Sequence, residues 1–192
     1  MPYLTSPVLA AGTLSRTAQP TIATGDGILL RPWREEDAPA VYEAFQDPLM
    51  HQWHIRAADS VAEARGWTAE WRRAWAEERN AQWAVADAAD DRLLGRVALR
   101  NVLLGDGVAE VAYWTTAAAR GRGVATRATV ALARWAFEVG LHRLELTHAV
   151  ANPASCRVAA GAGFALEGVK RSALRHADGW HDMHLHARLS DD

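Results

Sequence analysis

A glycine-punctuated basic turn carries the clearest chemical signal in the sequence. Residues 119–126 read Ala-Arg-Gly-Arg-Gly-Val-Ala-Thr and lie between an apolar strand-like run and a helix-like run. Glycine permits a positive φ, so several backbone N–H groups can point into one concavity, and a helix that begins near Thr126 adds unpaired N–H groups and the positive end of its dipole. Arg120, Arg122 and Arg127 add positive charge beside it. The turn is therefore a candidate phosphate site; the alternative is a surface loop that needs glycine only in order to turn.

A carboxylate and a capped helix start flank this turn. Glu110 lies inside the apolar run 108–114, where alternation puts it on the same strand face as Trp114. A carboxylate in such a run is unusual, and its structural explanations are a buried ion pair or a solvated edge position. After the helix-like run, Asn152 is followed by proline, which combines an N-cap residue with a preferred first helical residue, so Ser155 falls in the first helical turn.

Strand and helix signals alternate in an irregular order around these residues. Residues 108–114 and 142–150 read as strands, and residues 126–138 between them read as a helix that ends at Gly140. This order predicts a right-handed crossover between two parallel strands. The other predicted strands are residues 28–31, 82–88, 93–102, 163–174 and 180–189, and the other predicted helices begin at Arg34, Ser60 and Asn152.

Aromatic residues mark the segment between the first two helices and the second helix itself. Residues 49–58 have no clear period and are predicted to be a loop. In the helix that begins at Ser60, tryptophans recur every four residues on one face, and such a stripe is more often core than part of a ligand site. These are Trp67, Trp71 and Trp75.

The bulk properties indicate one globular domain. The chain has 192 residues, a formal net charge of −2 and a single cysteine, Cys156. This length suits one core, the charge gives no general attraction to nucleic acid or membranes, and one cysteine cannot form an internal disulfide. No apolar run approaches the roughly 20 residues of a membrane span. We predict a cytoplasmic protein with a partly disordered N-terminal tail, residues 1–27, and a single domain, residues 28–189.

Other common signatures are incomplete. A dinucleotide fingerprint would need a glycine in place of Thr126, and no P-loop Gly-Lys-Ser/Thr follows the turn. Several histidines lie near the C-terminus, but within one strand only His184 and His186 share a face, and no cysteine completes a ligand set. The sequence therefore predicts no metal.

The motifs taken together resemble a known family. The turn, Asn152 with Ser155, and Gly163-Phe164 have the spacing of the GNAT superfamily of N-acetyltransferases, in its branch of RimJ/RimL-like ribosomal-protein N-terminal acetyltransferases. The resemblance covers residues 28–189 and is strongest from Glu110 to Phe164. It implies an α/β (α+β) fold with a mixed central sheet of about six to seven strands flanked by about four helices. Further matching residues are Gly168, Arg171, Asp178, Gly179 and Asp182.

The resemblance also implies a binding site for acetyl-CoA. In that family the strand before the turn splays from the strand after the helix, and pantetheine lies in the gap, bonded to main chain of the first strand. The matching strand residues here are Tyr113, Trp114 and Thr115. Asn152 matches an asparagine that contacts CoA, although its N-cap role is a sufficient structural explanation. The turn residues that would bind the pyrophosphate are Arg120, Gly121, Arg122, Gly123, Val124, Ala125 and Thr126.

The implied catalytic residues are Glu110 and Ser155. Glu110 matches a strand carboxylate that related enzymes use as a base, and Ser155 could protonate the leaving thiolate. Its alternative is a first-turn serine that bonds backbone. Many members instead carry a tyrosine acid seven residues beyond the asparagine, where this chain has Ala159. His148 is a secondary base candidate or a packed core histidine. A covalent acetyl-enzyme on Cys156 is supported only by the position of this cysteine next to the motif.

The expected reaction is transfer of acetyl from acetyl-CoA to a primary amine by direct attack in a ternary complex. A protein N-terminal α-amine, with a pKa of roughly 8, needs less deprotonation than a lysine near 10.4. A small-molecule amine, a longer acyl donor or a non-catalytic acyl-CoA-binding module are the alternatives. Trp53 and His54 lie in the region that forms the acceptor site in this family. The alternative for Trp53 is that it packs into the core. The oligomeric state, including a homodimer, is left open, and no nucleic-acid or membrane partner is expected.

Overall fold

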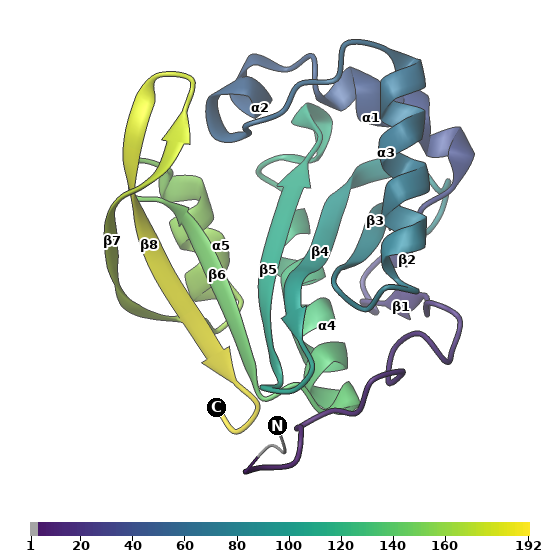
Figure 1. Ribbon diagram of the computed structural model, residues 1–192. Coiled ribbons are helices and arrows are strands. Elements are labelled where there is room, and N and C mark those ends of the chain that lie inside the picture. The colour runs from purple at the N-terminus through teal and green to yellow at the C-terminus, as the bar shows by residue number, and fades with distance from the viewer. Residues whose placement is uncertain (1–3) are drawn as a thin grey trace.

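A twisted, mixed sheet forms the centre of the molecule, which the computed structural model describes over residues 4–192 (Figure 1). The strand order is β1-β2-β3-β4-β5-β6-β8-β7, and every neighbouring pair is antiparallel except β5 and β6. The mixed sheet was predicted, with fewer strands. The strands are β1 (Ile22–Ala23), β2 (Ile28–Pro32), β3 (Ala81–Asp87), β4 (Leu93–Leu103), β5 (Val108–Thr115), β6 (Arg143–Ala149), β7 (Ala165–His176) and β8 (Gly179–Leu189).

Helices cover both faces of the sheet and divide the core in two (Figure 1). On one face, α4 packs its buried residues against β-strand side chains such as Val97 and Val111. On the other face, α1 and α3 enclose a second cluster around Trp33 and Trp114. None of the helices described in residues 4–192 is long and apolar enough to cross a membrane. The helices are α1 (Ala38–Ala44), α2 (Pro48–Trp53), α3 (Val61–Ala74), α4 (Val124–Val139) and α5 (Pro153–Gly161).

The predicted crossover joins the only parallel strands of the described sheet. Helix α4 connects β5 to β6, which pair from Val108 with Arg143 up to Val111 with Leu146. Beyond that point β5 continues to Thr115 and β6 to Ala149 without pairing to each other. The two strands therefore diverge, as the family resemblance implied.

The segment predicted as a loop over residues 49–58 contains a helix instead. Asp47 caps α2 by accepting a hydrogen bond from the N–H of Leu49 at 2.9 Å, and Pro48 occupies the first helical position. The Asp-Pro pair, read from the sequence as a helix stop, thus also starts the next helix. Helix α4 likewise begins at Val124 rather than Thr126, because Gly123 takes the N-cap position.

The tryptophan stripe lies in the core, as predicted. Trp71 and Trp75 are buried, and Trp67 packs edge-on against Phe45. Trp75 lies just past the end of α3 and reaches the opposite cluster, where it meets Trp83. One face of α3 therefore contributes to both halves of the core.

The N-terminal segment lies against the domain. Leu14 is buried in the core, and Trp75 donates its indole N–H to the carbonyl of Thr17 at 2.8 Å. The Glu78 carboxylate accepts N–H groups from Gly12 and Leu14, both at 2.6 Å, and from Ser15 at 3.0 Å. The sequence offered no signal for these contacts, because the carboxylate that anchors the segment lies more than 60 residues away.

Candidate active site

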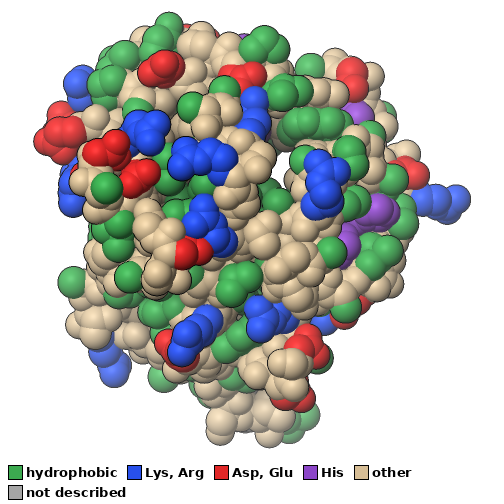
Figure 2. Space-filling view, turned by 180° about the vertical axis from the view of Figure 1, so that it is seen from behind, with side chains coloured by type: hydrophobic (Ala, Val, Ile, Leu, Met, Phe, Trp, Pro, Cys, Tyr) green, Lys and Arg blue, Asp and Glu red, His purple; other side chains and the backbone are tan. Residues whose placement is uncertain are grey.

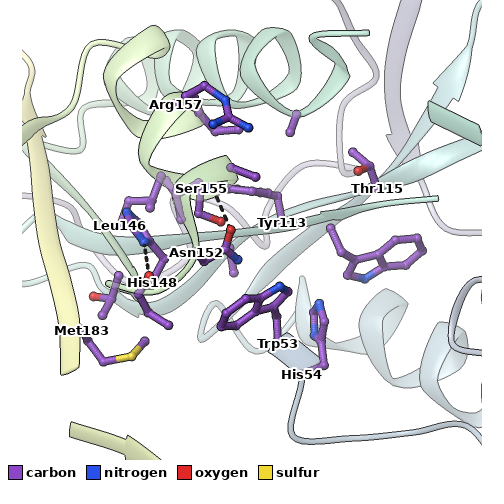
Figure 3. A pocket seen from close by; sticks show the side chains of 18 of the residues that line it. Trp53, His54, Tyr113, Thr115, Leu146, His148, Asn152, Ser155, Arg157 and Met183 are labelled. Carbon is purple, nitrogen blue, oxygen red and sulfur yellow. Dashed lines mark hydrogen bonds between the residues drawn. The ribbon is translucent and has the colours of Figure 1, made fainter. Parts of the chain in front are cut away.

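A cleft of about 950 Å³ opens where β5 and β6 diverge. Its walls come from the C-terminal ends of these strands, the turn before α4, the start of α5, helix α2 and strand β7 (Figure 3). Residues from both faces of β5 line it, so the cleft connects the α4 face of the sheet with the opposite face. The sequence-predicted residues on its wall are Glu110, Tyr113, Trp114, Thr115, Arg120, Gly121, Gly123, Val124, Ala125, Thr126, Asn152 and Ser155. Arg122 belongs to the same turn but does not line the cleft.

The basic turn has the geometry of an anion site. Gly121 and Gly123 both have φ of +71°, which side-chain-bearing residues rarely adopt, and Gly123 is the N-cap of α4. No protein acceptor in residues 4–192 bonds the backbone N–H groups of residues 121–126. A Cβ added at Gly121 would meet open space, so φ rather than crowding requires glycine there. Unpaired N–H groups and the positive end of α4 therefore face the cleft.

The arginines of this turn are largely engaged with carboxylates. Arg120 forms an ion pair with Asp47, the residue that caps α2. Arg127 pairs with Asp26 at 3.1 Å and also donates to the carbonyl of Arg122. Arg122 has no carboxylate partner in the described chain. Backbone N–H groups, with the partly neutralised arginines behind them, thus form the anion-facing surface.

The end of β5 presents polar groups that the described protein leaves unpaired. The Tyr113 hydroxyl and the Trp114 indole N–H are buried and have no hydrogen-bond partner within residues 4–192. Burial raises the pKa of Tyr113 to about 12, while the nearby Ser155 side chain acts in the opposite direction. From Ala112 to Thr115, β5 has no partner on its β6 side. A polar ligand in the gap would satisfy such groups.

Glu110 lies half-buried at the cleft wall on the face opposite α4. Its carboxylate accepts a hydrogen bond from the side-chain amide of Asn101 at 3.0 Å, and the described chain gives it no ion pair. Its register neighbour Glu145 on β6 is paired with Arg143 at 2.9 Å. The ion-pair explanation for Glu110 is therefore wrong, and of two adjacent carboxylates only Glu145 is neutralised.

The start of α5 holds Ser155 over the cleft. Asn152 caps the helix by accepting the Ser155 backbone N–H at 3.1 Å, so the Ser155 hydroxyl is not used by the cap (Figure 3). Ala159, where many GNAT members have tyrosine, is fully buried among core residues and does not line the cleft. The side chain at that position points into the core, and within residues 4–192 the only phenol on this wall comes from β5, at Tyr113.

Helix α2 and the β7–β8 hairpin close the far side of the cleft. Trp53 packs edge-on against His176 and His181, with ring centroids 6.1 and 6.3 Å apart, and belongs to neither core cluster. His54 packs edge-on against Phe45. Burial, followed by the positive field of Arg96, lowers the pKa of His54 to about 4. The alternative that Trp53 belongs to the core is therefore wrong.

Two contacts of the site were not predicted from the sequence. The Asn101 amide bonds Glu110 because the turn between β4 and β5 folds the two strands together. That turn was predicted, and counting outward from it would have placed these residues close together. The Arg120–Asp47 ion pair joins segments far apart in the chain, and nothing local to either segment indicates it.

Comparisons with known proteins agree with this geometry. A family model described as "Acetyltransferase (GNAT) domain" matches residues 28–165. The chain is 32% identical over 142 residues to the probable N-acetyltransferase YjcK of Bacillus subtilis, which covers 72% of this chain and 78% of that protein. It is 32% identical over 103 residues to the ribosomal-protein-serine acetyltransferase of Escherichia coli, covering 53% of this chain and 58% of that protein.

Solved structures share the whole fold. RimJ of Mycobacterium smegmatis, in complex with a CoA disulfide, superposes with a TM-score of 0.83 at 25% identity, covering 90% of this chain and 88% of that one. The microcin C7 self-immunity acetyltransferase MccE, in complex with acetyl-CoA and AMP, gives a TM-score of 0.83 at 19% identity, covering 91% and 98%. The latter likeness is one of fold alone.

Proposed function

The chain belongs to the GNAT acetyltransferase family, and we propose that it transfers acetyl from acetyl-CoA to the α-amine of a protein N-terminus. The observation that supports this most directly is the row of unpaired backbone N–H groups at residues 121–126, which faces the cleft between β5 and β6. A pyrophosphate placed there would accept several of these N–H groups and meet the positive end of α4.

Acetyl-CoA fits the remaining free groups of the cleft. We assign pantetheine to the gap beyond Val111, where β5 has no partner on its β6 side from Ala112 to Thr115. Its amides would there find backbone donors and acceptors. The buried, unpartnered Tyr113 hydroxyl lies on the same wall and would be satisfied by a polar group or an ordered water.

The chemistry needs a proton acceptor for the amine and a proton donor for the thiolate. The neutral amine attacks the thioester carbonyl, the carbon–sulfur bond breaks, and CoA leaves as thiolate. We assign Glu110 as the base, because no cationic side chain of the described residues forms an ion pair with its carboxylate. It would take the proton from the amine through a water molecule in the cleft. Ser155 is the proposed donor to the thiolate, since the helix cap leaves its hydroxyl free.

The acceptor is proposed from both the chain's relatives and the opposite opening of the cleft. One relative is named for acetylating ribosomal-protein serine, and an α-amine is more readily neutral near pH 7 than a lysine. The acceptor would enter between α2 and the β7–β8 hairpin, past Trp53. A small-molecule amine is the second candidate, because Trp53 and the hairpin histidines form a compact wall on that side. The single cysteine further supports a reducing, cytoplasmic setting.

Turnover with a panel of acceptors tests this function. Purified protein is incubated with acetyl-CoA and either peptides with free N-termini, the same peptides N-terminally blocked but containing lysine, or small amines, and free thiol is measured. We expect turnover with the free N-termini only. If only small amines gave turnover, the acceptor would be a small-molecule amine and not a protein N-terminus. CoA binding without turnover on any acceptor would favour an acyl-CoA-binding module.

A further inference from the structure

Three histidines from two neighbouring strands converge beside the cleft. His148 on β6 is paired in register with His184 on β8, and His186 follows two residues later on the same strand face. One ring nitrogen from each lies within 4.8 Å of the other two. His148 and His186 are buried, and His184 is half-buried. Figure 2 shows histidine side chains at the surface on the side of the molecule that β7 and β8 form.

Backbone carbonyls fix the tautomers of the two buried rings. His148 Nδ1 lies 2.9 Å from the carbonyl oxygen of Ala149, and His186 Nδ1 lies 3.3 Å from that of Phe164. A carbonyl oxygen can only accept, so each Nδ1 carries the ring's hydrogen. A neutral imidazole has one N–H, which leaves a lone pair on each Nε2.

These two lone pairs point at each other. The Nε2 atoms of His148 and His186 are 3.2 Å apart, a contact that requires a cation or a shared proton between them. A metal cation between the two Nε2 atoms would accept both lone pairs.

We propose that His148, His184 and His186 bind a divalent transition-metal ion of the Zn²⁺ type. Zn–N bonds of about 2.0–2.1 Å place two tetrahedral imidazole ligands roughly 3.3 Å apart, close to the 3.2 Å between these Nε2 atoms. Carbonyl acceptors on the opposite ring nitrogens are the usual way in which a protein orients histidine ligands. His184 supplies the third ligand, and its Nδ1 lies 3.5 Å from the thiol of Cys156, which holds the ring from α5.

The ion would bind outside the acetyl-transfer machinery but next to it. His148 also lines the cleft, so a fourth, water ligand can reach the ion from that side. The ligands tie β6 to β8 over the stretch where β6 has left β5. The bound ion would thereby stiffen the outer wall of the cleft, while the proposed base Glu110 and donor Ser155 need no metal.

Cobalt binding tests the site without relying on activity. Tag-free, chelator-treated protein in the absence of CoA is titrated with Co²⁺, and visible absorption is recorded. We expect one equivalent of Co²⁺ with the strong absorption of four-coordinate cobalt, its displacement by Zn²⁺, and a higher thermal midpoint with Zn²⁺. His184→Gln and His186→Gln should each weaken binding at least tenfold while circular dichroism stays native.

A second group of potential ligands supplies the control. His176, Asp178 and His181 also lie within 4.8 Å of one another, at the β7–β8 hairpin. His181→Gln should leave Co²⁺ affinity and spectrum unchanged. The proposal is overturned if the wild-type protein shows no binding at millimolar Co²⁺, or if binding survives in His184→Gln and is lost in His181→Gln. Because the wild-type titration needs no variant, a misfolded His186→Gln protein would not remove the test.

Discussion

Val111 and Leu146 form the last parallel pair between β5 and β6, and the cleft opens directly beyond them. Up to this pair the two strands satisfy each other's backbone groups, and beyond it they leave groups free for a ligand. The same divergence leaves the turn before α4 and the start of α5, with Ser155, on the wall of one cleft. A strand separation that would be a defect in an ordinary sheet thus creates the proposed acetyl-CoA site.

Gly123→Val should weaken CoA binding at least tenfold. Valine at φ of +71° costs about 1–2 kcal/mol, and relieving that strain would rotate the N–H groups away from the cleft. Calorimetry with CoA measures the effect. Gly66→Val is the matched control, because Gly66 has no positive φ and a Cβ there meets nothing within 4 Å. Undiminished affinity in Gly123→Val would refute the proposed geometry of the turn.

Glu110→Gln should lower kcat/KM by about 10²-fold and remove the acidic limb of its pH profile. Loss of a general base typically costs 10²–10⁴-fold, and glutamine keeps the size of the side chain and a hydrogen-bonding oxygen for Asn101. Glu145→Gln provides the comparison, since Glu145 lies beside Glu110 but is paired with Arg143. Steady-state kinetics should show a much smaller change for Glu145. Equal effects of the two variants would contradict the assignment of Glu110 as the base.

Ser155→Ala should lower kcat about tenfold or more without a loss of stability. The α5 cap uses the backbone N–H of residue 155, which alanine retains, whereas the hydroxyl is lost from the cleft. Asn152→Ala should instead lower the free energy of unfolding by about 1 kcal/mol, because it removes the cap. Chemical denaturation and kinetics on both variants separate the two roles. An unchanged kcat in Ser155→Ala would transfer the donor role to water or to the Tyr113 hydroxyl.

Local signals in the sequence predicted most of the fold. The strand, helix, strand order around the basic turn predicted the crossover, and the Asn152-Pro153 pair predicted the start of α5. The fold class and the GNAT resemblance are confirmed. The helix within residues 49–58 was missed, because six residues are too few to show a period and Asp47-Pro48 also reads as a stop.

Contacts between distant segments could not be predicted in the same way. The Arg120–Asp47 pair, the convergence of His148 with His184 and His186, and the burial of Leu14 each depend on how separate elements pack. The histidines illustrate the limit. Periodicity correctly put two of them on one face of β8, but the third comes from β6, whose neighbour in the sheet depends on topology rather than on sequence spacing. The roles of the cleft residues in acetyl transfer stay predictions.

Glu78→Ala should lower the free energy of unfolding by about 1–3 kcal/mol. Burial raises the pKa of Glu78, but hydrogen bonds from the Ser15, Gly12 and Leu14 N–H groups outweigh it and lower the pKa below its usual value. The carboxylate therefore holds the N-terminal segment as an anion. Urea denaturation of Glu78→Ala beside the exposed Glu77→Ala measures the effect. Equal stability of the two variants would show that these hydrogen bonds contribute nothing net.

His54 should make the protein less stable as the pH falls below about 6.5. Burial, and then the fields of Arg96, His176 and Arg100, lower its pKa from the ordinary value of 6.5 to about 4. Between these two values the unfolded chain binds a proton that the folded protein does not, so the free energy of unfolding falls with decreasing pH. Once the pH is below 4, His54 has lowered the free energy of unfolding by on the order of 3 kcal/mol relative to neutral pH.

Substitution isolates this contribution from those of other titrating groups. Denaturation of the wild type, His54→Gln and His51→Gln at several pH values between 4 and 7 gives three stability profiles. His51 lies in α2, just before His54 at the end of that helix, and is exposed, so it controls for removing a histidine from this segment. The His54→Gln profile should be flatter than the other two over this range. Parallel profiles for all three proteins would mean that His54 is protonated at the same pH in the folded and unfolded states, and that its burial against Phe45 does not exclude charge.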